Sequence, residues 1–424
     1  MRRCSNAIRV VALAGAGLLA GHVAAAAQPA GGDGGPEKPR LWGAQAVVVM
    51  THTAPAIAGE TLTETVLTQP VLSAALRAWG GRLELRGMAN LEGLTLEGGE
   101  LNPGAWGEGF VDRRHPHTLL HEVVGTVQLE RGPAAASLTV GKGFAPYGTD
   151  DPMARPFVKF PVNHHLAQIP ERALVIGAVR YGPAALEAGL FNGDEPEGPY
   201  DMPALSRLGD SWAARATVWP GAGVELSASH AWLNSPEHVG GAGLDRRLWS
   251  AAVRWARGAG PRRLYALAEW ARGDELHLGE RRFGFESVLV EGSVAVNGLT
   301  AALRLERTTR PEEERLADPF RTPRPHADFN ILGQTRWTIA TLRLEAGPGQ
   351  VAGLRALPFV EAAYLRPTQA ARPSLFVPGE FYGAERLWSV AAGVRLDAGS
   401  GHGRMGRYGA ALPPAAPAPG HGGH

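Results

Sequence analysis

Apolar and polar residues alternate with a period of two through most of the chain after Trp42. The segment 299–306 is typical: one parity holds only leucine and alanine, and the other holds Thr300, Arg304 and Glu306. Successive side chains of a strand point to opposite faces, so this alternation predicts β-strands with one apolar and one polar face. The pattern recurs in 211–219, 224–232, 285–296 and 387–396.

Tight turns and long polar stretches separate these strands in strict alternation. Gly-Gly, Gly-Pro and Asn-Gly pairs mark the tight turns, as at Gly80-Gly81 and Asn297-Gly298, whereas 97–117, 143–170 and 192–210 are long and polar. We count sixteen strands, each of about the ten residues that a tilted membrane strand needs. The pattern predicts an all-β fold: a transmembrane antiparallel up-and-down β-barrel of about sixteen strands, with short periplasmic turns and eight long external loops.

A secreted β-sandwich would also show period-two alternation. Two features favour the barrel. Charged residues occupy mid-strand positions on the polar face, and loop lengths alternate, which a sandwich does not require.

The ends of the chain differ from the strand region. Residues 1–27 have a basic start, a short apolar run and a small-residue cleavage site, which predicts a secretory signal peptide. Residues 28–41 are interpreted as a flexible leader, 42–398 as the β-barrel and 399–424 as a disordered Gly/Pro/His tail. An even strand count places both termini on the periplasmic side of the outer membrane of a Gram-negative bacterium.

Composition narrows the function classes. The formal net charge is +1, which argues against a nucleic-acid partner. The only cysteine, Cys4, lies within the predicted signal peptide, so disulfides and cysteine chemistry are excluded from the mature chain.

In these features the chain resembles the general porins of Gram-negative outer membranes over nearly all of 42–398. The resemblance implies that the third external loop, 143–170, which is also the longest by our boundaries, folds into the channel and narrows it. It also implies outer-membrane lipid and the assembly machinery as partners, and porins are often homotrimers. One departure is the end of the chain: porins usually finish on an aromatic residue, whereas here only the Gly393–Leu396 run could act as an internal assembly signal.

Two groups of charged residues are predicted to lie inside the barrel. The inward-facing wall residues are Glu84, Arg86, Arg215, Glu225, Arg254, Glu269, Glu291, Arg304, Glu306, Arg336 and Arg395. Arg336 and Arg343 fall on opposite parities, which a β-bulge between them would reconcile. The predicted constriction of the third loop comprises Lys142, Asp150, Asp151, Arg155 and Lys159. Both signs occur, so these residues either form a charged eyelet or pair across neighbouring strands.

Histidines cluster on both sides of the hairpin 122–141. Imidazole suits zinc or copper, so a divalent-metal site is a hypothesis for His115, His117, His121, His164 and His165. Against it, His121 shares the parity of Val123 and Val127, which predicts that it points outward at the rim.

The sequence contains no nucleophile elbow and no second histidine after His121-Glu122, so we expect no enzyme and no cofactor beyond that metal. We expect an outer-membrane channel for passive diffusion of small hydrophilic solutes. Two alternatives are open: a divalent-metal-binding channel or receptor, and a closed structural or adhesive barrel.

Overall fold

The structure is a computed structural model that describes residues 42–56, 59–96, 110, 117–196, 198–238, 240–259, 262–313, 331–371, 374–399 and 404–414. The predicted signal peptide 1–27 and the leader 28–41 lie outside the described residues. Among the described helices, none is both long enough and apolar enough to cross a membrane.

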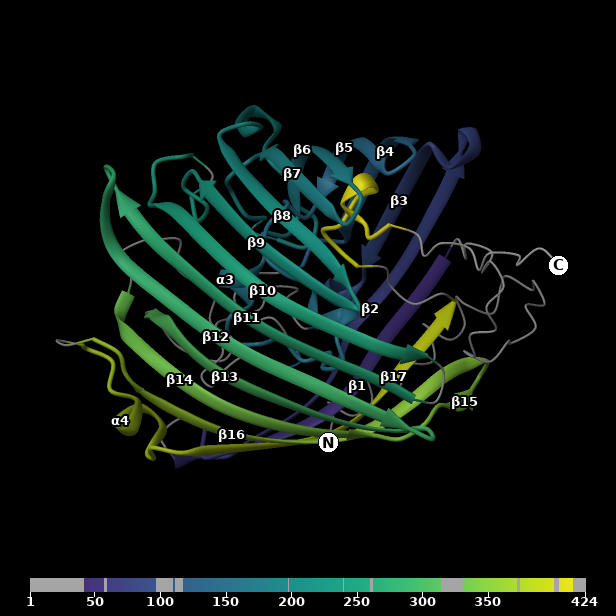
Figure 1. The fold of residues 1–424 in the computed structure, drawn as a ribbon. Helices are drawn as coiled ribbons and strands as arrows, with labels where there is room; N and C mark the ends of the chain where they lie inside the picture. The colour runs from purple at the N-terminus through teal and green to yellow at the C-terminus, as the bar shows by residue number, and fades with distance from the viewer. Residues whose placement is uncertain are drawn as a thin grey trace.

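The described strands form one antiparallel sheet that closes on itself (Figure 1). The last strand pairs with the first, from Gly43 opposite Gly399 to Ala54 opposite Trp388. The wall strands are β1 (Trp42–Ala54), β2 (Leu62–Ala78), β3 (Leu83–Asn90), β4 (Leu120–Arg131), β5 (Ala134–Gly143), β6 (Arg172–Tyr181), β7 (Ala184–Phe191), β8 (Ser211–Gly221), β9 (Val224–Leu233), β10 (Asp245–Ala259), β11 (Arg262–His277), β12 (Glu280–Val296), β13 (Leu299–Glu313), β14 (Ile331–Glu345), β16 (Leu354–Gln369) and β17 (Leu387–Gly399).

A further strand, β15 (Gly349–Val351), pairs only with the start of β16. The barrel therefore has sixteen wall strands, and the predicted all-β, up-and-down barrel is confirmed. Every seam joins strands that are consecutive along the chain, apart from the closing β1–β17 pair. Below, the short-turn end is the end with the Gly132-Pro133 and Asn297-Gly298 turns, and the long-loop end is the opposite one.

Burial follows the predicted period of two. In β12, Val288 and Val290 are about half exposed, whereas Leu289 and Glu291 are buried. The apolar residues thus cover the outside of the wall, and the inside carries the charges. This arrangement suits a barrel in lipid, where the outer face must be apolar.

The loop lengths at the long-loop end differ from the prediction in one place. Strands β11 and β12 continue to a two-residue connection, Leu278-Gly279, in which both residues have positive φ (53° and 81°). Positive φ at both central residues is the geometry of a tight hairpin turn. The polar sequence around this turn suggested a long loop, but polar residues also suit strands that continue beyond the apolar band.

The third external loop was predicted to be the longest. With the observed bounds, the connection 91–119 is about as long as the connection 144–171.

The predicted bulge in β14 is wrong. Residues 335–345 of β14 pair in an unbroken register with β16, and Thr335, Trp337 and Thr341 are buried while Thr338 and Leu342 are exposed. Arg336 shares the parity of the exposed residues. It therefore lies on the outer face and is not a lumen residue.

Candidate functional site in the barrel lumen

The connection between β5 and β6, residues 144–171, lies inside the barrel, and we call it the lumen loop. It crosses from one wall to the other. Gly148 N donates to Ser229 Oγ of β9 at 2.9 Å, and Val162 N donates to Glu306 Oε2 of β13 at 2.7 Å. Between these points Thr149 and Asn163 both donate to Glu269 of β11. The predicted inward folding of this loop is therefore present in the structure.

The two halves of the lumen loop pack against each other. Ala145 N donates to Ile169 O at 3.0 Å, and Tyr147 Oη donates to Leu166 O at 2.9 Å. Gly148 has φ +65°, and a Cβ there would lie 1.6 Å from Ala167 O. Only glycine fits such a close backbone approach, so this residue sets where the loop doubles back.

The two basic residues of the lumen loop in the predicted constriction are paired with the wall. Arg155 Nε donates to Glu291 Oε1 at 2.8 Å, and Lys159 Nζ lies 3.4 Å from Glu361 Oε1. Asp151 is used locally, since its Oδ1 accepts from Met153 N at 2.8 Å at the start of the 3-10 turn η3 (Pro152–Ala154).

Lys142 is separated from the other predicted constriction residues. It lies at the end of β5, where Gly141 (φ +147°) comes so close to Val123 that a Cβ would lie 2.1 Å from its carbonyl oxygen. Lys142 Nζ donates to Thr118 Oγ1, which in turn donates to Glu171 at 2.8 Å. Lys142 is therefore a buried residue of the rim at the long-loop end, where β5 passes into the lumen loop.

Several wall charges pair across neighbouring strands, which is one of the two arrangements that the sequence predicts. Arg215 of β8 binds Glu187 of β7 through two contacts of 2.7 and 2.9 Å. Arg304 Nε of β13 donates to Glu291 of β12 at 2.9 Å. Apart from Arg336, every predicted wall residue has the parity of the buried positions of its strand: Glu84, Arg86, Arg215, Glu225, Arg254, Glu269, Glu291, Arg304, Glu306 and Arg395.

Residues 404–414, which we call the C-terminal segment, also lie inside the barrel. This contradicts the prediction that all of 399–424 is a disordered tail; 400–403 and 415–424 lie outside the described residues. The segment is drawn in yellow against β4 to β7 in Figure 1. Its 3-10 turn η5 (Gly409–Ala411) is held by Ala410 N, which donates to Ser137 Oγ at 2.9 Å.

Two arginines anchor the C-terminal segment. Arg404 donates to Asp150 of the lumen loop at 2.8 and 2.9 Å and to Glu225 Oε1 of β9 at 2.8 Å. Arg407 Nη1 donates to Thr217 Oγ1 at 2.8 Å, and its Nη2 donates to Glu225 Oε1 at 3.2 Å. Arg404 thus joins the lumen loop, the wall and the C-terminal segment in one ion-pair network.

The electrostatics of this network match its geometry. Burial alone raises the pKa of Asp150, but the charges of Arg404 and Arg407 outweigh it, so the pKa of this carboxyl lies below its usual value. Burial and the charge of Arg215 lower the pKa of Arg407 to about 10. Burial lowers the pKa of Arg404, but Asp150 and Glu225 outweigh it and raise the pKa above its usual value, so both partners of the Arg404–Asp150 contact are charged at neutral pH.

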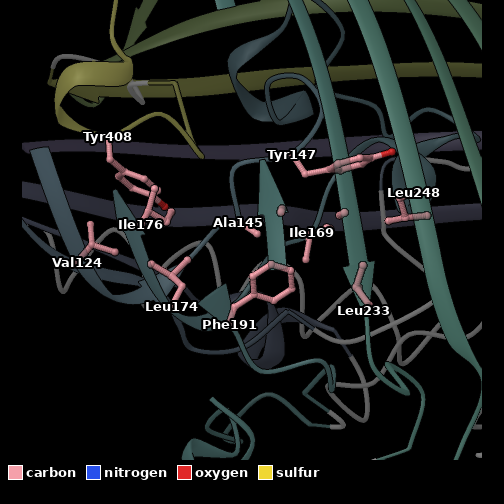
Figure 2. Close-up of a cluster of buried hydrophobic side chains, with 12 residues drawn as sticks. Val124, Ala145, Tyr147, Ile169, Leu174, Ile176, Phe191, Leu233, Leu248 and Tyr408 are labelled. Atoms are coloured by element: carbon pink, nitrogen blue, oxygen red, sulfur yellow. The ribbon is translucent and has the colours of Figure 1, made fainter. Parts of the chain in front are cut away.

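An apolar cluster holds both insertions against the wall (Figure 2). It contains Tyr147 and Ile169 from the lumen loop, Tyr408 from the C-terminal segment, and Ile176 and Phe191 from the wall. Tyr408 Oη also accepts from Phe144 N at 3.0 Å and donates to Glu122 Oε2 at 2.8 Å. Apolar burial and satisfied polar groups together fix these insertions in place.

His117 and His121, near the long-loop end, are buried and each contacts a glutamate. His117 Nδ1 lies 2.9 Å from Glu92 Oε2, and His121 Nδ1 lies 2.6 Å from Glu171 Oε1. The predicted outward orientation of His121 is wrong. The β3–β4 register shifts so that Met88 faces Glu122 and Ala89 faces Leu120, and this bulge turns His121 inward.

Each of these two carboxylates is held in its charged form. Burial raises the pKa of Glu171, but His121 and Lys142 outweigh it and lower the pKa to about 2. The pKa of Glu92 is likewise raised by burial but lowered overall by its hydrogen bond to His117.

The geometry of the described residues does not match the predicted divalent-metal site. Within the described residues, no three histidine, cysteine, aspartate or glutamate side chains form a group that could hold a metal ion. The His164 ring packs against Phe160 with centroids 4.8 Å apart and against His165 at 5.1 Å. His115 lies outside the described residues.

Sequence reasoning missed Arg404, Arg407 and Tyr408. A usable signal was present, because 404–408 reads Arg-Met-Gly-Arg-Tyr within a stretch otherwise rich in glycine, proline and alanine. Charged and aromatic residues clustered in such a stretch indicate a contact with the folded domain.

No protein-family model and no curated protein sequence matches this chain. The high-pH structure of Pseudomonas putida OprB matches with a TM-score of 0.54 at 11% identity, covering 84% of this chain and 94% of that one. An anion-selective porin from Comamonas acidovorans has a TM-score of 0.48 at 12% identity, with 84% and 98% covered. The trimer form of OmpT, an outer membrane protein of Vibrio cholerae, has a TM-score of 0.46 at 11% identity, also with 84% and 98% covered.

Proposed function

Because this chain folds as a porin-like β-barrel, we propose that it is an outer-membrane channel for passive diffusion of small hydrophilic solutes. The observation that carries the proposal is a closed wall of sixteen strands that is apolar outside and charged inside. A loop that is anchored on both sides crosses the lumen within this wall. Polar wall groups replace part of a solute's hydration as it passes, and no covalent step is involved.

The lumen loop would set the size and charge limits of the channel. Its charges Asp150, Arg155 and Lys159 are each matched by an opposite charge on the wall or on the C-terminal segment. A strongly selective pore concentrates one sign of charge at its narrowest point. We therefore propose weak ion selectivity for the intact protein.

The proposed orientation places the long-loop end outside the cell and both termini in the periplasm, as the even strand count requires of an exported chain. Outer-membrane lipid and the assembly machinery are the proposed partners, with a homotrimer as the proposed assembly.

Planar-bilayer conductance of the purified, detergent-refolded protein tests the proposal. We expect stable ohmic steps with a reversal potential close to zero in a salt gradient. The double variant Arg155→Ala/Lys159→Ala leaves Glu291 and Glu361 without these loop charges, so its reversal potential should move toward cation selectivity. An absence of conductance steps in the intact protein would refute the channel and favour a closed structural barrel.

The same recording with micromolar zinc tests the metal-binding alternative. His117 and His121 contact glutamates and His164 packs against Phe160, so we expect no effect of zinc on conductance. Block or gating by zinc would instead favour a metal-binding channel or receptor.

A further inference from the structure

The C-terminal segment places two guanidinium groups against three carboxylates inside the barrel. Arg404 binds Asp150 and Glu225, and Arg407 Nη1 lies 3.6 Å from Glu187 Oε2 in addition to its contact with Glu225. These carboxylates belong to the lumen loop, to β9 and to β7. The segment thus covers acidic groups that would otherwise face the lumen.

The fit between the segment and the wall is close from Met405 to Ala411. Met405 packs with Met88, Phe144 and Met153, and Ala410 and Ala411 are buried against alanines of β5 and β6. The Cβ that a substitution would add at Gly409 (φ +51°) would lie 2.4 Å from Ser137 Oγ. Such packing indicates a defined position inside the barrel.

We propose that the C-terminal segment is a selectivity element of the channel: Arg404 and Arg407 neutralise lumen carboxylates, and the segment itself narrows the lumen beside the lumen loop. This inference rests on the proposed channel function. It assigns part of the ion selectivity of the pore to residues that follow the last strand of the barrel.

Removal of the segment changes the charge of this part of the lumen in a defined direction. Glu187 keeps its contact with Arg215 at 2.7 Å, and Asp150 keeps Arg254 at 3.6 Å. Glu225 keeps the neutral indole N–H of Trp219 at 3.0 Å. Two positive charges leave and three carboxylates stay, so the lumen becomes more negative and should attract cations.

The test compares three proteins in planar bilayers under a salt gradient. One is the full chain, one ends at Gly399 and lacks the segment, and one ends at Pro414 and keeps it. The chain ending at Gly399 should show a larger single-channel conductance and a cation-over-anion permeability ratio raised by about twofold or more, since wall charge controls local counter-ion concentration. The chain ending at Pro414 should match the full chain.

A second variant tests the same proposal without truncation, so the result does not depend on whether the truncated chain folds. Arg404→Gln/Arg407→Gln keeps the backbone and removes only the two charges, so it should give the same shift in selectivity. Its matched control is Arg281→Gln/Arg282→Gln, which removes two exposed arginines beside the β11–β12 turn and should leave the permeability ratio unchanged.

The outcomes separate the two proposals. Conducting channels with the same permeability ratio in the full chain and in Arg404→Gln/Arg407→Gln overturn the selectivity element and leave the channel standing. Conductance only after removal of the segment overturns both proposals for the intact chain, because the segment would then be a plug that closes the pore. An absence of conductance in every protein overturns the channel itself, and the selectivity element with it.

Discussion

The anchor of the lumen loop on the β12–β13 wall gives a quantitative prediction for Glu291→Gln. Glu291 is fully buried between Arg155 Nε at 2.8 Å and Arg304 Nε at 2.9 Å, and it also accepts from Tyr265 Oη at 3.0 Å. Glutamine keeps the size of the side chain and removes its charge. Two buried guanidinium groups then lose their shared counter-charge.

The expected cost follows from burial. Removal of one partner from a buried ion pair typically costs about 3–5 kcal/mol. Glutamine retains one acceptor oxygen, so we expect the lower end, about 3 kcal/mol, or roughly a hundredfold in the folding equilibrium. Within the described part of the chain, Arg155 Nη2 and Arg304 Nη2 have no hydrogen-bond partner. These two N–H groups already lack an acceptor, so the loss of a carboxylate oxygen at Glu291 leaves a further buried donor without a partner.

The assay is urea unfolding in lipid vesicles, combined with a double-mutant cycle using Arg155→Met. The coupling between the two positions should exceed about 1 kcal/mol, because the residues are in direct contact. Glu280→Gln, on the exposed start of the same strand, is the control and should change stability by less than about 0.5 kcal/mol. A Glu291→Gln protein as stable as that control would refute the reasoning.

Three further predictions follow from the same structure. Trp337→Ala, at a fully buried inward position, should lower the unfolding free energy by about 3–5 kcal/mol; a loss below about 1 kcal/mol in urea unfolding would contradict the packing described. Gly148→Ala should disturb the lumen loop, because its Cβ would lie 1.6 Å from Ala167 O; the expected result is noisier single-channel current, and an unchanged trace argues against the close approach. The arginines of the C-terminal segment lower the pKa of Asp150. The contact between Arg404 and Asp150 therefore stabilises the segment fully above the ordinary carboxyl pKa of about 3.9, and it weakens as the pH falls through the lower pKa that Asp150 has in the folded protein. The backbone N–H of Ala410, which donates to Ser137 Oγ, should therefore stay protected from hydrogen exchange from pH 7 down to about pH 4 and lose its protection below that pH; protection that is already lost at about pH 6 would show that a different group holds the segment.

The strands that form the wall of the barrel were predictable from the sequence alone. A strand exposes alternate residues to lipid and to the lumen, so the parity of Val288, Val290 and Glu291 in β12 already specified which side each faces. Turn residues such as Asn297-Gly298 specified where neighbouring strands meet. A pattern of residue types that repeats at a fixed period depends only on the local sequence, so it predicts strands without knowledge of the tertiary structure.

The two wrong predictions about strand faces both concern β-bulges. A bulge at His121 turned that residue inward, while β14 continued without the expected bulge and left Arg336 outside. Both outcomes depend on the register with a neighbouring strand. Period two within a single strand does not contain that information.

The contents of the lumen were decided by tertiary structure. The sequence shows that Asp150 and Arg155 lie on a long loop, but only the closed barrel brings them to Arg404 and Glu291, which are far away along the chain. The C-terminal segment looked disordered because its glycines favour no single backbone conformation and its prolines lack the N–H that a helix or strand needs. Its position comes from burial of Tyr408 and from ion pairs with a wall that exists only once the sixteen strands have closed. The sequence by itself therefore determined the barrel wall, and the tertiary structure determined the position of the two segments inside the lumen.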